Sequence, residues 1–361
     1  MVKKRIVFTG GGTAGHVTPN IALINRLKME GWDIHYIGSE TGMERELIAA
    51  VPNVTYHPIS SGKLRRYLSW QNLLDPFRVI KGIGQSKRLI RALHPDVVFS
   101  KGGFVSVPVV MAAGKTPVVA HESDYTPGLS NRIASRFSDQ ICVTFEDTLR
   151  YVPENKGVFT GTPIRPELYL GERARALQYT GLSGSKPVLL VMGGSQGAQR
   201  PNELLREALP ALLPQFDIIH LCGRGKIDDA CARAGYLQYE YITEELPDLF
   251  ALADIVFSRA GANTVFELLA LNKPAVLMPL PLSCSRGDQI LNAQYFENKG
   301  YAITLDQQTA TADTLADALK TLYRDRIKYG GAMESDTRCD GTESILKIIK
   351  DAANTERKSI V

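Results

Sequence analysis

The chain has 361 residues, of which 44% are hydrophobic and 22% charged, and its formal net charge is +4. This length is too great for one ordinary hydrophobic core and predicts two domains of roughly 160 to 190 residues. No apolar run approaches the roughly 20 residues of a membrane-spanning helix, so we expect neither a spanning segment nor a secretory signal.

The cysteines and histidines predict a protein of the reducing cytoplasm that needs no metal. The five cysteines are scattered and none is spaced as Cys-x-x-Cys, which argues against a disulfide framework and against a zinc site. No two histidines stand four residues apart, and no Asp-x-Asp is present to hold a divalent cation on a diphosphate. We therefore expect metal-independent chemistry and no cofactor.

Short apolar runs alternate with amphipathic stretches through the first half of the chain. Arg5–Thr9 is predicted as a buried strand, and the helical spacing from His16 to Glu30 predicts a helix that Gly31 ends. The alternation continues with strands over 34–38, 97–100, 118–121 and 141–145, and helices over 43–50, 107–113 and 129–137. This pattern predicts parallel strands with helices on both faces of the sheet.

A second alternating series follows a turn-rich segment at 157–166. Its predicted strands cover 188–192, 218–222, 255–258, 275–278 and 302–305, and its helices cover 202–213, 245–253, 263–271 and 289–298. The predicted fold class is therefore α/β, with two doubly wound Rossmann-like domains. We expect the first domain at 1–162, the second at 163–340, and a helix in 341–361 that crosses back to the first.

Positive charge is concentrated in one segment of the first half. Residues 1–160 hold 20 Lys and Arg against 13 Asp and Glu, a net charge of +7, whereas the rest of the chain has a net charge of −3. Eight of these basic side chains lie within 60–91, among aromatic and aliphatic residues. The candidate membrane patch comprises Lys63, Arg65, Arg66, Leu68, Trp70, Leu73, Leu74, Phe77, Arg78 and Lys81.

This mixture of side chains favours an anionic membrane surface, where each nearby basic charge contributes about 1 kcal/mol. The aliphatic content suits nucleic acid poorly, so we expect no nucleic-acid partner. The alternative is an ordinary amphipathic helix whose apolar face belongs to the core, and part of the segment fits that description.

Each predicted domain has a glycine-rich turn after its first strand, Gly10–His16 in the first and Gly193–Ala198 in the second. In open α/β sheets such turns present backbone N–H groups and a helix N-terminus to an anion. The candidate phosphate-binding residues of the first turn are Gly12, Thr13, Ala14 and Gly15.

The first turn also matches Gly-x-Gly-x-x-Gly, the dinucleotide pattern, so a nicotinamide-dependent oxidoreductase is an alternative. Against it, the first acid at the end of the second strand, Glu40, lies 25 residues beyond Gly15. A nicotinamide site would also leave the second set of loops unexplained.

His16 and Asp124 are the candidate proton-transfer residues. A histidine at the start of a helix is more often structural than catalytic. However, His121–Asp124 follows another strand of the same predicted sheet, and the ends of neighbouring strands converge on one crevice. Ionisable groups beside an anion-binding loop suggest proton transfer. The alternative is that His121 and Glu122 only position the following helix.

Three features of the second half suit a nucleotide sugar. Glu267 lies about one turn into a predicted helix, where a carboxylate accepts hydrogen bonds from a ribose diol or only balances the helix dipole. Asp288 and Gln289 bring an acid and an amide to a similar strand exit, where they can contact sugar hydroxyls. Arg165, in the linker, can neutralise a diphosphate without a metal.

These segments, in this order from Ile6 to about Gly300, are similar to those of the bacterial MurG-type enzymes of peptidoglycan synthesis. The matching segments are GGGTAGHVTPN at 10–20, SKGGFVSVPVVMAA at 100–113, HESDYTPGLSNRIA at 121–134, GTPIR at 161–165, GGSQGA at 193–198, RAGANTVFE at 259–267 and DQILNA at 288–293. So many motifs in register make the resemblance specific.

The resemblance implies a GT-B fold, in which two Rossmann-like domains face each other across a cleft. It implies an inverting transfer of N-acetylglucosamine from UDP-N-acetylglucosamine to undecaprenyl-pyrophosphoryl-N-acetylmuramoyl-pentapeptide, lipid I, with attack by the C4 hydroxyl of the muramoyl sugar. The product is lipid II. The implied location is peripheral, at the cytoplasmic face of the cell membrane.

By family motif, the second domain binds the donor and the first binds the acceptor. The implied donor site comprises Arg165, Ser195, Gln196, Gly197, Ile242, Ala262, Asn263, Thr264, Glu267, Asp288 and Gln289. Thr13, Ala14 and Gly15 bridge the acceptor diphosphate and the donor, and His16 is the residue whose loss most reduces turnover.

This chain departs from the family at Asp124, where many relatives carry Asn. A carboxylate can act as a general base where an amide cannot, so the base is either His16 or Asp124. Two further alternatives are a related glycosyltransferase with another lipid acceptor, such as a diacylglycerol, and a catalytically silent scaffold.

Overall fold

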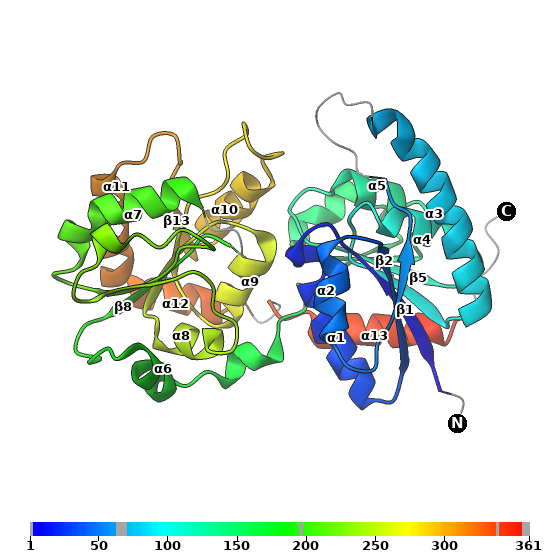
Figure 1. Ribbon diagram of the computed structural model, residues 1–361, viewed down its shortest axis with the longest axis horizontal. Helices are drawn as coiled ribbons and strands as arrows, with labels where there is room; N and C mark the ends of the chain where they lie inside the picture. The colour runs from blue at the N-terminus through cyan, green and yellow to red at the C-terminus, as the bar shows by residue number, and fades with distance from the viewer. Residues whose placement is uncertain (1–2, 63–70, 195–197, 337–338, 356–361) are drawn as a thin grey trace. The chain divides into compact units, whose positions relative to one another are not determined.

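The computed structural model describes residues 3–62, 71–194, 198–336 and 339–355. The chain forms two units, unit 1 from Met1–Ile164 with Asp340–Val361 and unit 2 from Arg165–Cys339 (Figure 1). Each unit is a parallel sheet with helices packed against it. The predicted α/β class with two doubly wound domains is therefore confirmed.

Unit 1 is built on a seven-stranded sheet with the order β3-β2-β1-β4-β5-β6-β7. Its strands are β1 (Arg5–Thr9), β2 (Asp33–Ser39), β3 (Thr55–Ile59), β4 (Val97–Ser100), β5 (Val118–Glu122), β6 (Gln140–Val143) and β7 (Gly157–Phe159). Because β1 pairs with both β2 and β4, the strand order reverses at β1. Ligands of open α/β sheets bind beside such a reversal, at the carboxyl ends of the strands.

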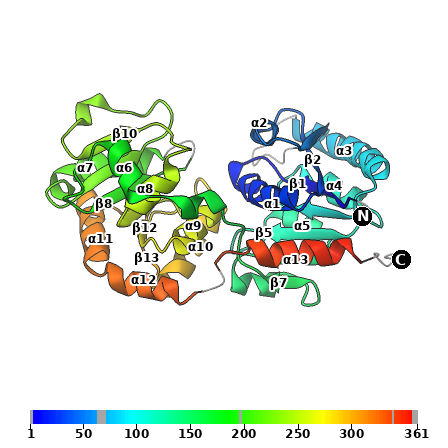
Figure 2. The same cartoon turned by 90° about the horizontal axis from the view of Figure 1, so that it is seen from below.

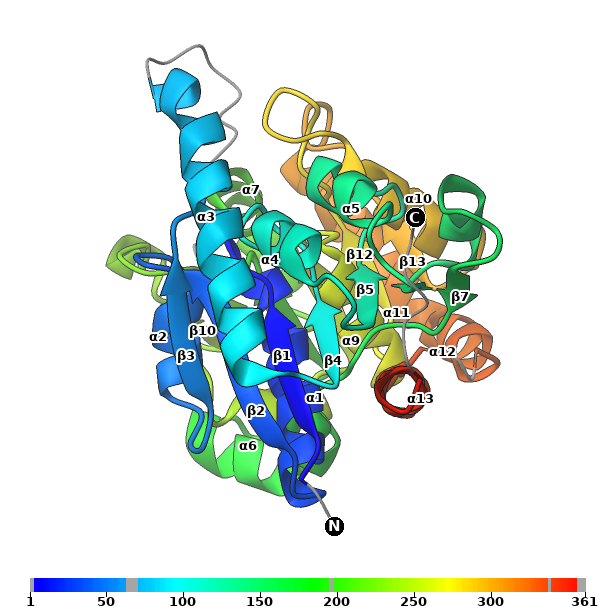
Figure 3. The same cartoon turned by 90° about the vertical axis from the view of Figure 1, so that its right-hand side faces the viewer.

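Helices cover both faces of this sheet, so its central strands are fully buried. One face carries α1 (Thr18–Met29), α2 (Met43–Ala49) and α13 (Thr342–Ala353). The other carries α3 (Gln71–Leu93), α4 (Ser106–Ala112) and α5 (Leu129–Ala134). Figure 3 shows the long helix α3 beside α4. Ile6, Val7 and Phe8 of β1 have no exposed surface.

Helix α13 comes from the far end of the sequence and packs into unit 1 beside β5 (Figure 2). Ile345, Leu346 and Ile349 are fully buried and join the core that includes Leu23 and Leu27 of α1. The surface ion pairs between α1 and α13 add little, because exposed pairs are worth at most about 1 kcal/mol. Apolar burial therefore fixes this helix in unit 1.

Unit 2 is built on a six-stranded sheet with the order β10-β9-β8-β11-β12-β13. Its strands are β8 (Val188–Met192), β9 (Asp217–Leu221), β10 (Tyr236–Tyr239), β11 (Ile255–Ser258), β12 (Ala275–Leu277) and β13 (Ala302–Thr304). Its helices are α6 (Arg173–Thr180), α7 (Gln199–Leu212), α8 (Leu246–Leu252), α9 (Ala262–Ala270), α10 (Asp288–Asn298), α11 (Ala312–Arg324) and α12 (Arg326–Glu334). Leucines of α7 and α11 fill one core with the central strands.

The structure differs from the sequence prediction at the edges of the sheets and at the first helix. The strands that were not predicted, β3, β7 and β10, are all edge strands and lack a continuous apolar run. The predicted helix from His16 begins instead at Thr18, after a short 3₁₀ turn over Ala14–His16. Pro19 in the first turn explains this start, since proline is tolerated there and not inside a helix.

Helix α3 changes character along its length. The C-terminal half of α3 packs into the core of unit 1 through Ile83, Leu89, Ile90 and Leu93. For this half, the alternative of an ordinary amphipathic helix with a core-facing apolar side is therefore correct. Nearer its start, Phe77 and Ile80 are 70% and 65% exposed. Of the candidate membrane patch, Lys63, Arg65, Arg66, Leu68 and Trp70 lie outside the described residues, and the side chains of Leu73 and Leu74 are not described. No helix that the structure describes is both long and apolar enough to cross a bilayer.

Substitution of Ile349 by Ala should destabilise unit 1, because it removes buried methylene groups and leaves a cavity under α13. We expect the free energy of unfolding to fall by about 2–5 kcal/mol, measured by urea denaturation. Lys347→Ala, on the exposed side of the same helix, is the control and should stay close to wild type. Equal unfolding midpoints for the two variants would contradict the role given to α13.

Candidate active site

The first glycine-rich loop follows β1 and is packed too tightly for side chains at two positions. A Cβ atom on Gly10 would lie 2.7 Å from the carbonyl oxygen of His16, and one on Gly11 would lie 2.5 Å from Cδ of Glu44. The Tyr36 hydroxyl donates to the Gly10 carbonyl at 2.7 Å. The loop is therefore held in one conformation by groups beneath it.

Glu44, which belongs to none of the sequence motifs, is the main support of this loop. Its carboxylate is 1% exposed and accepts hydrogen bonds from the Gly12 N–H at 3.2 Å, from the Ser39 N–H at 3.0 Å and from the Ser39 hydroxyl at 2.5 Å. A bonded carboxylate thus already occupies the Gly12 amide, one of the groups predicted to face a phosphate. The only sequence signal was an acid in the first turn of α2.

The hydrogen bonds of His16 define its tautomer. Its Nδ1 lies 3.1 Å from the Gly11 carbonyl oxygen and 3.1 Å from the Thr13 hydroxyl. A carbonyl oxygen only accepts, so Nδ1 carries the proton and donates to Gly11. In the neutral ring the basic lone pair is then on Nε2, the arrangement that a general base requires.

The end of β5 holds a buried polar cluster. His121 is fully buried, its Nε2 lies 3.0 Å from the Gly161 carbonyl, and its Nδ1 lies 2.7 Å from Nζ of Lys101. Burial, together with the Lys101 charge, lowers the pKa of His121 well below its ordinary value. His121 is therefore a neutral structural residue, which is the alternative that the sequence left open.

Glu122 is likewise structural and anchors the loop that carries Asp124. Its carboxylate accepts from the Asp124 N–H at 2.9 Å, from the Gly128 N–H at 3.1 Å and from the Asn131 side chain at 2.9 Å. Burial and the nearby Asp124 carboxylate raise the pKa of Glu122. Glu122 thus fixes the backbone of Asp124, which is itself half-buried.

The structure brings the loops after β1, β4 and β5 together at one edge of the unit 1 sheet. The Gly11 N–H donates to the Gly102 carbonyl at 3.3 Å, joining the first two loops. Lys101, between them and β5, contacts both His121 and Ser123. His16 and Asp124 therefore belong to the same edge, as the sequence predicted from the strand ends.

In unit 2, Arg165 and Glu267 form a pair. Arg165 Nε lies 3.0 Å from Glu267 Oε1, and its terminal nitrogen lies 3.3 Å from Oε2. Burial raises the pKa of Glu267, and Arg165 opposes that rise. The pair uses two of the five arginine donors and one lone pair on each carboxylate oxygen. Each residue thus keeps hydrogen-bonding capacity for a ligand while holding the other in place.

The other residues predicted to bind the donor substrate lie around the carboxyl edge of the unit 2 sheet. Ala262, Asn263 and Thr264 begin α9, and Ile242 is buried after β10. Gln289 accepts from the Leu280 N–H at 3.0 Å, and Asp288 pairs with Arg286. Ser195, Gln196 and Gly197 lie outside the described residues.

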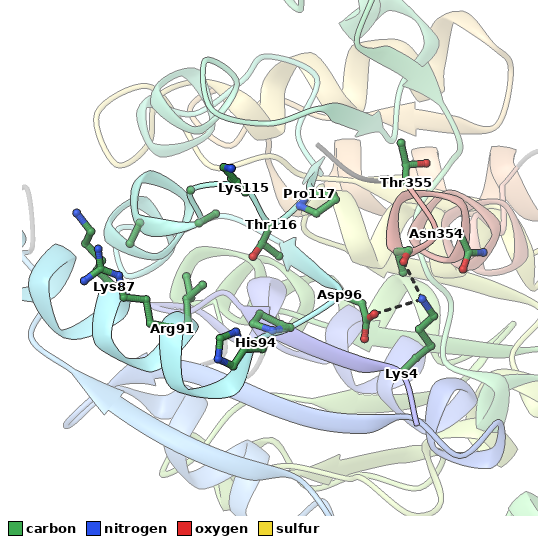
Figure 4. Close-up of a pocket in the computed structure, with 16 residues that line it drawn as sticks. Lys4, Lys87, Arg91, His94, Asp96, Lys115, Thr116, Pro117, Asn354 and Thr355 are labelled. Atoms are coloured by element: carbon green, nitrogen blue, oxygen red, sulfur yellow. Dashed lines mark hydrogen bonds and ion pairs between the residues drawn. The ribbon is translucent and has the colours of Figure 1, made fainter. Parts of the chain in front are cut away.

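A cavity of about 1010 Å³ lies at the opposite, amino-terminal edge of the unit 1 sheet (Figure 4). Lys87, Arg91 and Lys115 line it, and Lys4 pairs there with Asp96 at 3.2 Å. The glycine loop lies at the other end of these strands, so the cavity is not part of the candidate site.

Among the described residues, no group of three or more His, Cys, Asp or Glu is arranged to hold a metal ion.

Comparisons with known proteins cover both units of the chain. The model of the glycosyltransferase family 28 N-terminal domain matches residues 6–143, and that of the family 28 C-terminal domain matches residues 188–351. Two relatives are named UDP-N-acetylglucosamine–N-acetylmuramyl-(pentapeptide) pyrophosphoryl-undecaprenol N-acetylglucosamine transferase. The relative from Lachnospira eligens is 54% identical over 96% of this chain and 99% of its own length. The relative from Geobacillus thermodenitrificans is 51% identical over 98% of this chain and 100% of its own length.

Solved structures are similar over the whole chain as well. The crystal structure of Acinetobacter baumannii MurG is 26% identical, with a TM-score of 0.77 over 96% of this chain and 99% of its own. The calicheamicin glycosyltransferase CalG4 is 14% identical, with a TM-score of 0.69 over 98% of this chain and 99% of its own, a likeness of fold alone.

Replacement of Glu44 by Ala should loosen the first loop, because three donors lose their acceptor. We expect the free energy of unfolding to fall by about 1–3 kcal/mol, the cost of leaving a buried donor unpaired, measured by thermal and urea denaturation. Glu46→Ala, on the exposed side of the same helix, is the matched control. If the two variants are equally stable, Glu44 does not support the loop.

Proposed function

The chain belongs to glycosyltransferase family 28, and we propose that it transfers N-acetylglucosamine from UDP-N-acetylglucosamine to the muramoyl sugar of lipid I, giving lipid II. The observation that carries this proposal is the identity of about half of all residues, over nearly the whole chain, with relatives named for that transfer. The polar groups at the carboxyl ends of both sheets support it independently.

Unit 2 is proposed to bind the donor. The Glu267 carboxylate accepts hydrogen bonds from the ribose diol, and Arg165, held by Glu267, donates to the diphosphate. The N-terminus of α9, with Ala262, Asn263 and Thr264, adds backbone donors and a positive dipole end. Ile242 contacts the base, Asp288 and Gln289 contact the transferred sugar, and Ser195, Gln196 and Gly197 are proposed for the diphosphate.

Unit 1 is proposed to bind the acceptor, with its diphosphate at Thr13, Ala14 and Gly15. The Gly12 amide, which the sequence also predicted for this role, is already bonded to Glu44. The acceptor C4 oxygen attacks the anomeric carbon as the bond from that carbon to the diphosphate of UDP breaks. His16 Nε2 takes the hydroxyl proton. Attack on the face opposite to the leaving group inverts the anomeric configuration.

The charge that develops on the leaving UDP is stabilised by fixed groups of unit 2. Arg165 and the α9 N-terminus are oriented before the reaction, so they need no reorganisation as the negative charge appears. With these groups in place, the proposed transfer needs no metal ion. Asp124 is the competing candidate for the base, because it is a carboxylate on the same sheet edge.

Transfer of labelled N-acetylglucosamine from the UDP-sugar to a short-chain lipid I analogue, with EDTA present, tests this function. We expect product from the wild type, and a loss in kcat of about 10²- to 10⁴-fold in His16→Ala if His16 is the base. Asp124→Asn keeps the shape of the side chain and should retain most activity. The opposite ranking would make Asp124 the base.

Glu267→Ala serves as the donor-side variant in the same assay and should raise KM for the UDP-sugar more than KM for the acceptor. If the protein binds the UDP-sugar but does not transfer the sugar to this acceptor, it uses another acceptor. Diacylglycerol would then be the first alternative acceptor to assay. Absence of nucleotide-sugar binding would overturn the proposal.

Unit 1 is also proposed to dock on the anionic cytoplasmic face of the cell membrane, which holds the lipid acceptor. The exposed Phe77 and Ile80 insert among lipid chains, and the exposed Arg78 and Lys81 contact the headgroups. The basic and aromatic residues at 63–74 are proposed to extend the same patch.

Cosedimentation with phosphatidylglycerol vesicles tests this docking. Arg78→Gln with Lys81→Gln should weaken binding by about 2 kcal/mol, since each charge near an anionic surface contributes about 1 kcal/mol, and high salt should abolish the difference. Phe77→Ser with Ile80→Ser should weaken binding at any salt. Ile327→Ser, which removes an 81% exposed side chain from unit 2, is the control. Equal binding by all variants would exclude this surface.

A further inference from the structure

Lys101 is a fully buried lysine just after the carboxyl end of β4, and the proposed mechanism does not use it. A buried charge is costly unless it is paired and hydrogen-bonded. The ion pairs between described residues include none from Lys101. Burial lowers the pKa of its ammonium to about 7, although Glu122 and Asp124 oppose that shift. Among the described residues, no carboxylate forms an ion pair with this amino group.

The contacts of Lys101 lie among the strand ends at the carboxyl edge of the unit 1 sheet. Its N–H donates to the Thr9 carbonyl at 2.9 Å, which holds its backbone against the strand that leads into the first glycine loop. Its Nζ donates to Nδ1 of His121 at 2.7 Å and to the Ser123 hydroxyl oxygen. Because Nε2 of His121 donates to Gly161, Nδ1 can only accept, and the ammonium is fixed between two acceptors.

The Ser123 hydroxyl can link the Lys101 ammonium to a ligand by hydrogen bonds. A hydroxyl that accepts from an ammonium can donate its own proton to a third group, and such charge-assisted chains are stronger than neutral ones. Ser123 is 9% exposed whereas Lys101 has no exposed surface, so of these two residues only Ser123 reaches the protein surface. The Ser123 hydroxyl is thus a polarised donor at the acceptor edge.

We propose that Lys101 is a positioning residue for the acceptor diphosphate, acting through the Ser123 hydroxyl, which donates to a phosphate oxygen. This inference rests on the proposed function for the identity of the acceptor. Two carboxylates, Glu122 and Asp124, flank Ser123 and would repel a diphosphate. Lys101 offsets that repulsion, and the hydroxyl supplies the directional contact.

The test compares Lys101→Met, Ser123→Ala and the double variant with the wild type in transfer to the short-chain lipid I analogue. Loss of a hydrogen bond to a charged group should raise KM for the acceptor roughly 10- to 100-fold, with KM for the UDP-sugar unchanged. The double variant should be no worse than the more affected single variant, because both substitutions break one chain of contacts. Ser123→Ala keeps the test open if Lys101→Met does not fold.

The control is Lys273→Met, which removes a half-buried lysine whose pKa burial also lowers. It lies in unit 2, where its Nζ donates to the Ala253 carbonyl. It should leave KM for the acceptor unchanged. Equal changes in Lys101→Met and Lys273→Met, or a rise in both Michaelis constants of Lys101→Met, would reduce Lys101 to a structural role and overturn the inference.

A binding measurement separates this inference from the proposed function. Calorimetric titration with inorganic pyrophosphate, with saturating UDP in the nucleotide site, should give binding to the wild type and weaker binding to Lys101→Met. If the wild type binds pyrophosphate through Lys101 but does not use the lipid I analogue, the acceptor is wrong and the inference stands. If it transfers normally and Lys101→Met is unchanged, the function stands and the inference fails. If it does neither, both fail.

Discussion

The close approach of two backbone segments at the switch point of the first sheet determines how unit 1 builds its site. Gly11 donates to the Gly102 carbonyl, and a Cβ atom on Gly103 would lie only 2.2 Å from the Gly11 oxygen. The loops after β1 and β4 can therefore approach this closely only if residue 103 is glycine. Glu44 accepts from the Gly12 N–H of the first loop, and the Lys101 N–H donates to the Thr9 carbonyl at the end of β1.

Buried charges around this contact are held by hydrogen bonds that the fold supplies. Glu44 binds backbone and hydroxyl donors, and Glu122 binds three further donors that fix the loop of Asp124. In unit 2, Arg165 and Glu267 hold each other. Such groups need no reorganisation when a charged substrate arrives, which is the condition for electrostatic stabilisation of a transition state.

The sequence predicted the central strands well because burial on both faces leaves a continuous apolar run. The predicted bounds of Arg5–Thr9, Val97–Ser100 and Ile255–Ser258 are those of β1, β4 and β11. Edge strands such as β3 carry no such run and were missed. The family was also identified, since seven motifs in register carry far more information than one loop.

The supports of the site could not be read from the sequence, because they depend on which loops meet in space. Glu44 lies 32 residues from the Gly12 amide that it accepts from, and Lys101 lies 20 residues from His121. Neither spacing has a periodic signal. A motif marks the groups that face a ligand, whereas the groups behind them are defined only by the packed strand ends.

The proposed role of His16 as the general base depends on the same loop contact. The Gly11 carbonyl that accepts from His16 Nδ1 belongs to the segment that Gly102 holds in place, so the ring is oriented by the strand order of the sheet. When Nε2 takes a proton, the ring becomes an imidazolium cation. Its Nδ1–H then donates a charge-assisted hydrogen bond to Gly11, which is stronger than the bond from the neutral ring. Asp124 has a backbone that Glu122 fixes, and it is the competing candidate for the base. The geometry therefore favours His16 as the residue whose protonation the fold stabilises.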